Sequence, residues 1–391
     1  MNIIEDTNEG LDWNPQKDKV EDYIFVTYSF HSDFDSKEAA YFLAREQSTS
    51  TYNRLHGETI EIREARATKL YDLKKDIFVL AYPIANIRFQ ISELLVTING
   101  SGNFLHSKIF SKLIVEGIQF PKKFLGNFSG PKYGKDLLEY FDITKRPILI
   151  GVQKPSIGLP TAQHVERALE AFRGGCEIVK DDEQLYPDDP ANLIEDRLKI
   201  LAEKLPGLRK KYKKNFIYVF NLASDEKILD YCKLIEKYSK EKIPLFGIMV
   251  SLLLGLPFIR FVRENTKLPL FSHPSGFGLY TRGPYGFSNH ALVKILRLSG
   301  VDCIIHPGVY SDIAYADEKM SKAAKNSCNE KMDSIKQSIL AFGGGMRKEN
   351  YKQTQKLMNG NDFVFLVGGA IFGNKNGPKS GAEDLIKFME S

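Results

Sequence analysis

The stretch "CEIVKDDEQ", residues 176–184, sets a mostly apolar run directly against charged side chains. Lys180 is followed by three carboxylates, those of Asp181, Asp182 and Glu183. Continuous apolar runs are typical of parallel strands that are buried on both faces. In barrels built from such strands, functional groups gather at the carboxyl ends of the strands. The stretch therefore predicts a buried strand that ends in a functional site.

The same pattern recurs along the chain after Arg146. Most gaps between the apolar runs carry a helical pattern, such as "TAQHVERALEAFRGG" at residues 161–175. Apolar strands that alternate with helices indicate a parallel sheet covered on both faces. Eight such units fit a (β/α)8 TIM barrel, and a doubly wound open sheet is the alternative. The eight runs span residues 147–153, 177–183, 215–223, 245–251, 268–273, 301–307, 338–345 and 362–369.

The residues before the barrel mix strand and helix patterns. We expect a flexible N-terminal arm at residues 1–21, an α+β (ferredoxin-like) domain at residues 22–142 and the barrel with the active site at residues 143–391. The α+β class of the first domain rests on five segments, one of them an acidic helical segment that contains "KEAAYFLAREQ" (37–47). We predict strands in "DYIFVTYSF" (22–30), "KKDIFVLAYPI" (74–84) and "SELLVTING" (92–100), and a helix in "FLHSKIFSKLIVEGI" (104–118).

Composition limits the possible partners. The chain has 391 residues, 43% hydrophobic and 26% charged, which is ordinary for a soluble globular protein. A net charge of +5 is too small to favour nucleic-acid binding, and we interpret the basic run "RKKYKKN" (209–215) as a solvated helix end. The four cysteines are widely spaced, without a CxxC motif, which favours a reducing compartment without disulfides or zinc. We find no signal peptide or apolar membrane span, and expect a cytoplasmic protein that binds neither membranes nor nucleic acid.

The charged end of the opening stretch suggests a metal site. Side chains alternate along a strand, so Lys180 and Asp182 should face the same way, with Glu183 at the turn. Two carboxylates suit Mg²⁺, but a protonated lysine beside them would repel the ion. A neutral lysine can instead add CO₂ and become an anionic carbamate ligand, which requires a lowered pKa. The alternative is a structural network of ion pairs at the barrel mouth.

Other strand ends could complete such a site. Lys154, after the first strand, could be a general base next to a carbonyl group, although a lone lysine there is more often a surface residue. The turns with Gly344 and Gly345, and with Gly368 and Gly369, could bind phosphate through backbone N–H groups, although tight turns use glycine routinely. Two histidines that close strands could transfer protons or orient phosphate, or could be structural: His273 and His306.

Together these motifs resemble the RuBisCO large-chain superfamily. "GGCEIVKDDE" resembles its carbamate motif, which implies that Lys180 carries CO₂ as a carbamate and binds Mg²⁺ with Asp182 and Glu183. "RPILIGVQKPSIGL" resembles the first barrel strand, which implies that Lys154 is the enolising base. The glycine turns are similar to the family's phosphate-binding loops.

The resemblance also covers the N-terminal half. "AREQSTSTY" resembles the segment that gives Glu46 and Thr51 to the active site, and "GSGNFLHSKIFSKLIVEGI" places Asn103 there. In the family these residues come from the partner subunit. The resemblance therefore implies a homodimer with shared active sites, possibly within a higher oligomer, that binds a small phosphorylated substrate.

Three departures from the carboxylase pattern narrow the function. The loop after strand six, "HPGVYSDIAYADEKM" (306–320), has no lysine at the matching place, Ser156 replaces a lysine and Pro274 replaces a phosphate-binding arginine. This pattern is similar to the RuBisCO-like proteins (form IV). It implies a Mg²⁺-dependent enzyme that forms an enediolate of a phosphorylated keto sugar or sugar acid, for tautomerisation, isomerisation or C–C hydrolysis rather than CO₂ fixation. The alternatives are a non-catalytic regulatory or assembly protein with a relic site, and a true ribulose-bisphosphate carboxylase.

Overall fold

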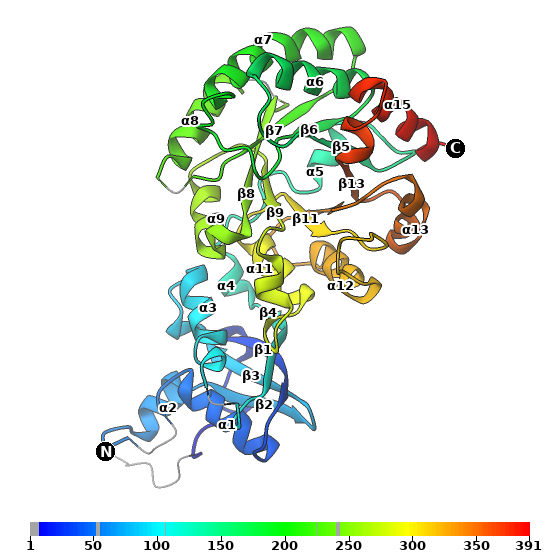
Figure 1. Cartoon of the computed structure of the whole chain (residues 1–391). Coiled ribbons are helices and arrows are strands. Elements are labelled where there is room, and N and C mark those ends of the chain that lie inside the picture. Colours follow the sequence, from blue (N-terminus) through cyan, green and yellow to red (C-terminus); the bar gives the residue numbers. More distant parts are fainter. Residues whose placement is uncertain (1–7, 52–54, 106, 225, 240–242) are drawn as a thin grey trace. The chain divides into compact units, whose positions relative to one another are not determined.

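The computed structural model describes residues 8–51, 55–105, 107–224, 226–239 and 243–391. The chain divides into two compact units (Figure 1). The N-terminal unit comprises Met1–Ser129, Phe277–Leu298 and Lys331–Ile335. The barrel unit comprises Gly130–Gly276, Ser299–Glu330 and Lys336–Ser391. The units differ from the expected ranges 22–142 and 143–391, because a segment from within the barrel sequence completes the N-terminal sheet.

Within the described residues, the barrel unit holds eight parallel strands that close on themselves (Figure 1). The last strand pairs with the first, as Val364 lies opposite Ile148. Closure confirms the predicted TIM barrel and excludes an open sheet. Each predicted apolar run contains one strand: β5 (Ile148–Val152), β6 (Ile178–Lys180), β7 (Ile217–Asn221), β8 (Phe246–Ser251), β9 (Leu270–His273), β11 (Cys303–Pro307), β12 (Ile339–Gly343) and β13 (Val364–Val367).

Helices surround these strands (Figure 1). None of the described helices combines the length and apolar composition that crossing a membrane requires. The helices of the barrel unit are α5 (Asp136–Glu139), α6 (Thr161–Arg173), α7 (Ile194–Tyr212), α8 (Ile228–Tyr238), η4 (Leu252–Leu254), α9 (Leu256–Glu264), α12 (Glu318–Asn329), α13 (Lys348–Met358), α14 (Gly369–Phe372) and α15 (Gly377–Met389).

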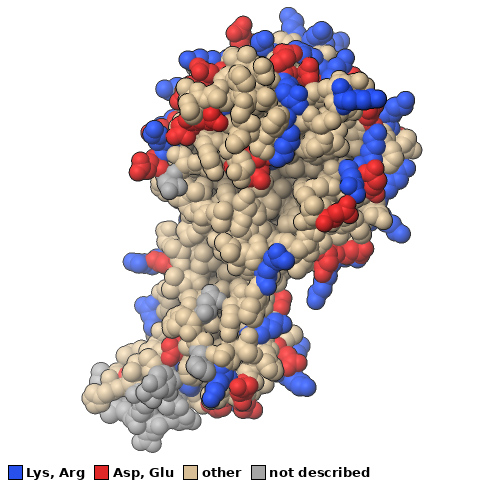
Figure 2. All heavy atoms as spheres, in the orientation of Figure 1, with Lys and Arg blue, Asp and Glu red and all other residues tan. Residues whose placement is uncertain are grey.

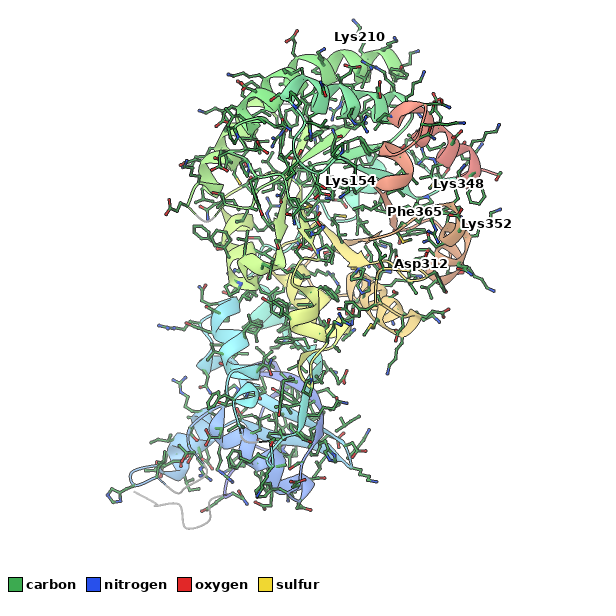
Figure 3. The ribbon with its side chains drawn as sticks, viewed as in Figure 1. Lys154, Lys210, Asp312, Lys348, Lys352 and Phe365 are labelled. Carbon is green, nitrogen blue, oxygen red and sulfur yellow. The ribbon has the colours of Figure 1, made fainter. Side chains whose placement is uncertain are left out.

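The predicted basic helix end is the C-terminus of α7. Lys210, labelled in Figure 3, lies on this helix, and Lys211 and Lys213 beside it are exposed as well. Basic side chains in the last turn of a helix interact favourably with its dipole. On the face seen in Figure 2, positive and negative side chains lie interspersed over the barrel unit.

The barrel interior is a packed apolar core. Alternate residues of β5, Ile148, Ile150 and Val152, point into it and contact inward residues of the other strands. Ile178 of β6 belongs to the same core. Because side chains alternate, Lys180 also points inward at the mouth of the barrel, whereas Asp181 points outward toward the helices.

The N-terminal unit is built on a sheet with the strand order β10-β4-β1-β3-β2. The pairs among β1, β2, β3 and β4 are antiparallel, and helices connect β1 to β2 and β3 to β4, which is the expected ferredoxin-like arrangement. β10 adds a parallel strand beside β4. The strands are β1 (Tyr23–His31), β2 (Lys69–Lys74), β3 (Ile77–Pro83), β4 (Lys112–Gln119) and β10 (Tyr285–Phe287). The helices are η1 (Val20–Asp22), α1 (Ser36–Glu46), α2 (Ile60–Arg66), η2 (Ile84–Asn86), α3 (Ile91–Asn99), η3 (Ser101–Asn103), α4 (Lys122–Leu125), α10 (Phe277–Thr281) and α11 (Asn289–Leu298).

Two predicted elements of this unit were wrong. "SELLVTING" forms helix α3 rather than a strand, because Ile91, Leu94 and Ile98 are buried at helical spacing while Val96 is exposed. The end of "FLHSKIFSKLIVEGI" forms strand β4 rather than a helix. Its buried residues are Leu113, Val115 and Ile118. A shift in the register with β1 interrupts their alternation, so the sequence does not show a regular strand period.

The described part of the expected N-terminal arm is bonded to the sheet. Leu11 is fully buried, and the Trp13 N–H donates to the Leu70 carbonyl of β2 at 3.0 Å. Trp13 also packs edge-on against Tyr23. Residues 1–7 of the expected arm lie outside the described residues.

Candidate active site

Lys154 and Asp182 meet at the mouth of the barrel, where β5 and β6 end side by side. The Lys154 Nζ lies 2.5 Å from Asp182 Oδ2 and 2.9 Å from Ser156 Oγ. Burial acts to raise the pKa of Asp182, but the Lys154 ammonium and the Gln184 N–H outweigh burial and hold that pKa below its ordinary value. In Figure 3, Lys154 lies among the strands of the barrel.

Lys180 is buried at the end of β6, with 1% of its surface exposed. Its Nζ donates to the Asp181 carbonyl at 2.7 Å. Burial lowers the pKa of Lys180 to about 8, against the opposing effect of Glu183 and Asp182. A substantial share of the amine is therefore neutral near physiological pH, which is the form that can react with CO₂.

Glu183 is paired with His273 from the end of β9. His273 Nε2 lies 3.3 Å from Glu183 Oε2. The Ser275 N–H donates to His273 Nδ1 at 3.2 Å, so the ring proton lies on Nε2 and points at the carboxylate. Burial, with the Lys180 charge second, lowers the pKa of His273 to about 3. The imidazole is thus held neutral and aimed at a predicted metal ligand.

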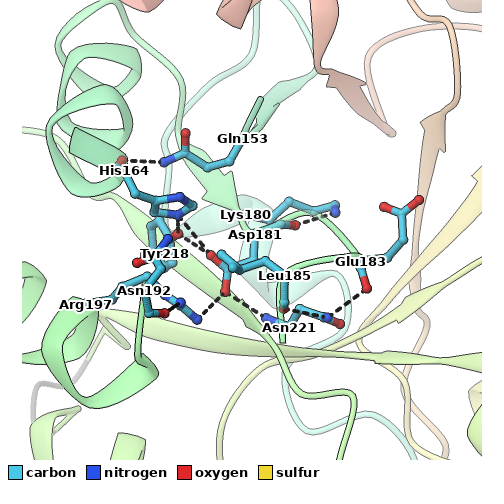
Figure 4. A network of polar contacts seen from close by, with 10 residues as sticks. All are labelled: Gln153, His164, Lys180, Asp181, Glu183, Leu185, Asn192, Arg197, Tyr218 and Asn221. Carbon is cyan, nitrogen blue, oxygen red and sulfur yellow. Dashed lines mark hydrogen bonds and ion pairs between the residues drawn. The ribbon is translucent and has the colours of Figure 1, made fainter. Parts of the chain in front are cut away.

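The Asp181 side chain points away from this group and lies at the centre of a buried network (Figure 4). Its Oδ2 accepts from Arg197 Nη2 at 3.3 Å and from the Asn221 N–H at 3.1 Å. Its Oδ1 accepts from the Tyr218 hydroxyl and lies 3.3 Å from His164 Nε2. Burial acts to raise the pKa of Asp181, but Arg197 and the other partners hold it below its ordinary value. No role for Asp181 was predicted from the sequence, because its partners on α6, α7 and β7 are far apart in the chain.

His306 at the end of β11 is fully buried. Its Nδ1–H donates to the Pro307 carbonyl at 2.8 Å, and its ring lies edge-on to Phe342 with the centroids 5.9 Å apart. Burial lowers the pKa of His306 to about 4. The predicted contact of His306 with substrate stays a prediction.

The two glycine turns present backbone to solvent at the mouth. Gly344 and Gly345 are exposed and have φ values of +86° and +71°. Gly369 is also exposed, and Gly368 is close to Lys154, because a Cβ at Gly368 would lie 3.6 Å from Lys154 Cε. The turns are therefore shaped so that an anion could approach their N–H groups.

The loop after β11 is open to solvent and is linked to the Gly344–Gly345 turn by an ion pair. Ile313 in this loop is 78% exposed. The neighbouring Asp312 is paired with Arg347, which follows the Gly344–Gly345 turn, at 2.6 Å between Oδ2 and Nη2. The sequence analysis did not predict this ion pair.

The three predicted site residues of the N-terminal unit lie on two adjacent segments. Glu46 is the last residue of α1, and its carbonyl accepts from Ser101 Oγ of η3 at 3.4 Å. Arg45 Nε donates to the Thr51 carbonyl at 3.2 Å, and Asn103 ends η3. Their contribution to the active site of a partner subunit stays a prediction.

The side chains at the mouth fit a magnesium site if Lys180 is carbamylated. Among the described residues, no three His, Cys, Asp or Glu side chains gather as a metal site would need. Asp182 and Glu183 supply two hard carboxylate donors, and the buried Lys180 amine beside them would supply a third only as a carbamate. The donor set thus fits Mg²⁺ together with the modified lysine.

Comparisons with known proteins agree with this geometry. Residues 135–390 match the model of the ribulose bisphosphate carboxylase large chain, catalytic domain, and residues 12–124 match that of its N-terminal domain. The chain belongs to the RuBisCO large-chain family. A ribulose bisphosphate carboxylase-like protein of Archaeoglobus fulgidus is 28% identical, over 98% of this chain and 89% of the relative. A ribulose bisphosphate carboxylase of Pyrococcus furiosus is also 28% identical, over 97% and 90%.

A solved structure shares the fold of this RuBisCO family member. The dimeric archaeal Rubisco from Hyperthermus butylicus superposes with a TM-score of 0.82 at 24% identity, and the match covers 98% of this chain and 93% of that one. The family resemblance inferred from "GGCEIVKDDE" is confirmed. The two relatives, one a carboxylase and the other a carboxylase-like protein, are equally similar to this chain in sequence. Sequence identity therefore favours neither reaction, and the residues of the site decide between them.

Proposed function

We propose that this protein is a Mg²⁺-dependent RuBisCO-like enzyme that acts on a monophosphorylated keto sugar or sugar acid. The reaction would pass through an enediolate and end in tautomerisation, isomerisation or C–C hydrolysis, without CO₂ fixation. The observation that carries the proposal is the convergence of Lys154, Lys180, Asp182 and Glu183 at the mouth of one barrel.

Lys180 and the two carboxylates would hold the metal. The neutral Lys180 nitrogen attacks the carbon of CO₂, an N–C bond forms, and one proton leaves the nitrogen for solvent. The resulting carbamate, Asp182 and Glu183 would supply oxygen ligands to the metal. A bound Mg²⁺ would polarise the substrate carbonyl and stabilise the charge of the enediolate.

Lys154 would move the proton next to the carbonyl group. Its side chain is 43% exposed, so it reaches the open mouth, whereas Lys180 is buried. Ser156 Oγ and Asp182 position its Nζ. If Asp182 held the metal, it would no longer pair with Lys154, and the Lys154 amine would be available to the substrate while Ser156 kept the side chain in place.

The mouth favours a substrate with a single phosphate. The exposed turns at Gly344–Gly345 and Gly368–Gly369 offer N–H groups to one phosphate. At the place where the family resemblance implies a phosphate-binding arginine, this chain has Pro274. The loop 306–320 has no lysine at the matching place, which argues against carboxylation. The Lys154–Asp182 contact argues against a relic site.

We further propose a homodimer with shared active sites, in which Glu46, Thr51 and Asn103 complete the site of the partner. The likeness to a dimeric family member supports this arrangement. Assembly into a higher oligomer would be compatible with it.

The first test is ¹³C NMR of the purified protein with ¹³CO₂, with and without Mg²⁺. A carbamate signal that Mg²⁺ strengthens and that Lys180→Ala abolishes is expected. The same protein is then screened with monophosphorylated keto sugars and sugar acids in D₂O, where enolisation exchanges a C–H proton for deuterium.

Two results would overturn the proposal. One is full turnover of a found substrate by both Lys154→Ala and Lys180→Ala. The other is incorporation of labelled CO₂ that depends on ribulose bisphosphate, because it would establish a carboxylase.

A further inference from the structure

We infer that Asp181 is a positioning residue that holds Lys180 and Glu183 in place for carbamate formation and metal binding, an inference that rests on the proposed function. Asp181 lies between these two residues in the chain but points away from them. Its network is drawn in Figure 4.

The network ties the end of β6 to three other elements. Asp181 accepts hydrogen bonds from Arg197 of α7 and from the hydroxyl of Tyr218 on β7, and lies 3.3 Å from His164 Nε2 of α6. Tyr218 and His164 contact each other at 2.8 Å. The Asp181, Arg197 and Tyr218 side chains are fully buried, so water cannot replace a lost partner.

From Asp181 the contacts lead back to the metal ligands. Asp181 Oδ2 accepts from the Asn221 N–H, and Asn221 Nδ2 donates to the carbonyls of Glu183 at 3.1 Å and Leu185 at 3.0 Å. On the other side, the Asp181 carbonyl accepts from Lys180 Nζ at 2.7 Å. Asp181 therefore fixes the peptide on which the Lys180 amine is anchored and the turn that carries Glu183.

A comparable ion pair at the other end of the same strand provides a control that distinguishes an effect on the metal site from an effect on stability. Glu177, just before β6, accepts from Arg146 Nη2 at 2.7 Å and from the Leu149 N–H at 2.9 Å. Like Asp181, Glu177 is a buried carboxylate held by one arginine and one backbone N–H. It lies at the amino end of β6, away from the mouth, where the barrel architecture serves stability rather than chemistry.

The test compares Asp181→Asn with Glu177→Gln by thermal unfolding and by the Mg²⁺ titration of the ¹³C carbamate signal. Both variants lose a buried charge pair, so we expect both to lower Tm. Asp181→Asn alone should raise the Mg²⁺ concentration that gives half of the maximal carbamate signal, by about 10- to 100-fold. This is the usual loss of metal affinity when a residue that supports the metal ligands is replaced. A normal titration for Asp181→Asn, or an equal shift for Glu177→Gln, would overturn the inference.

A milder variant covers the case in which Asp181→Asn does not fold. Tyr218→Phe removes one hydroxyl from Asp181, with Tyr351→Phe as the control, since its hydroxyl contacts the Met389 carbonyl at 3.4 Å elsewhere in the barrel unit. We expect a several-fold shift of the Mg²⁺ titration for Tyr218→Phe only, and equal titrations for the two variants would contradict the inference. If the parent protein itself gave no carbamate signal, that result would contradict the proposed function rather than the role of Asp181.

Discussion

The ammonium group of Lys154 lies 2.5 Å from a carboxylate oxygen of Asp182, so the proposed proton carrier and a proposed metal ligand share one ion pair. The cation and Mg²⁺ would therefore compete for the same carboxylate. The pair is half open to solvent on the lysine side, which limits its strength to about 1 kcal/mol.

This competition predicts opposite effects of Lys154→Met on binding and on turnover. Removing the ammonium leaves Asp182 free, so Mg²⁺ should bind as tightly as to the parent or a few-fold more tightly. Loss of a general base or acid should lower kcat by about 10²- to 10⁴-fold. Mg²⁺ titration and turnover are measured beside Lys210→Met, an exposed lysine on α7. Weaker Mg²⁺ binding by Lys154→Met would show that Lys154 supports the metal site instead of competing with it.

If the Gly344–Gly345 turn binds phosphate, the substitution Gly345→Ala should abolish phosphate binding. In Gly345→Ala, the new Cβ would clash with Ser311 Oγ and would lie 3.0 Å from Ile313, in a backbone conformation with φ of +71°. We expect a loss of about 1–3 kcal/mol of stability, and loss of the protection against unfolding that inorganic phosphate gives the parent.

Gly360→Ala is the control for this change. Gly360 has a φ of +127° with nothing within 4 Å of the new Cβ, and it precedes β13 at the amino end of the barrel. It should lower stability and keep phosphate protection. Undiminished phosphate protection in Gly345→Ala would remove this turn from the substrate site.

Buried His306 predicts a loss of stability in acid. Its pKa is lowered to about 4 in the folded protein, from an ordinary value of 6.5. The unfolded chain therefore binds the proton more tightly, and the stabilisation present above pH 6.5 is lost as the pH falls toward 4, up to roughly 3 kcal/mol. Urea unfolding at pH 7 and pH 4 should show a smaller difference for His306→Gln than for the parent. The same substitution at the exposed His31 is the control, and an unchanged difference in His306→Gln would contradict the prediction.

Shared active sites predict complementation between two inactive variants. Glu46→Gln alters the N-terminal unit and Lys154→Met alters the barrel unit, and each alone should lose most turnover. In a mixed dimer, one of the two sites would combine both intact halves. Co-expression with random pairing should restore about a quarter of parental activity, because half of the dimers are mixed. Activity no higher than that of the separate variants would mean that each chain builds its own site.

Much of the barrel could be predicted because its strands are buried on both faces. Such strands appear as continuous apolar runs, and each run ends where polar side chains gather. The N-terminal unit was harder, because its strands and helices alternate in a less regular order and its apolar runs fit a strand or a helix equally well. There the buried residues of α3 lie at positions 91, 94 and 98 and those of β4 at positions 113, 115 and 118, and both segments are rich in β-branched residues.

The inward-pointing residues of the site could be predicted from strand alternation, which placed Lys180 and Asp182 on one side. The contacts that hold these residues in place could not be predicted from the sequence. Asp181 binds Arg197 and Tyr218, and His273 is oriented by Ser275, through local geometry that the sequence does not encode as a spacing. Such partners are found only when the helices and strand ends are placed in three dimensions.

The strand β10 bears on how the chain is made. It pairs with β4, with Gly286 opposite Ile114, yet it is synthesised only after the first five strands of the barrel. At ribosomal speeds the edge of β4 waits unpaired for on the order of ten seconds. An open sheet edge is where chains join wrongly, so the nascent protein passes through a period in which it depends on being kept apart from its neighbours.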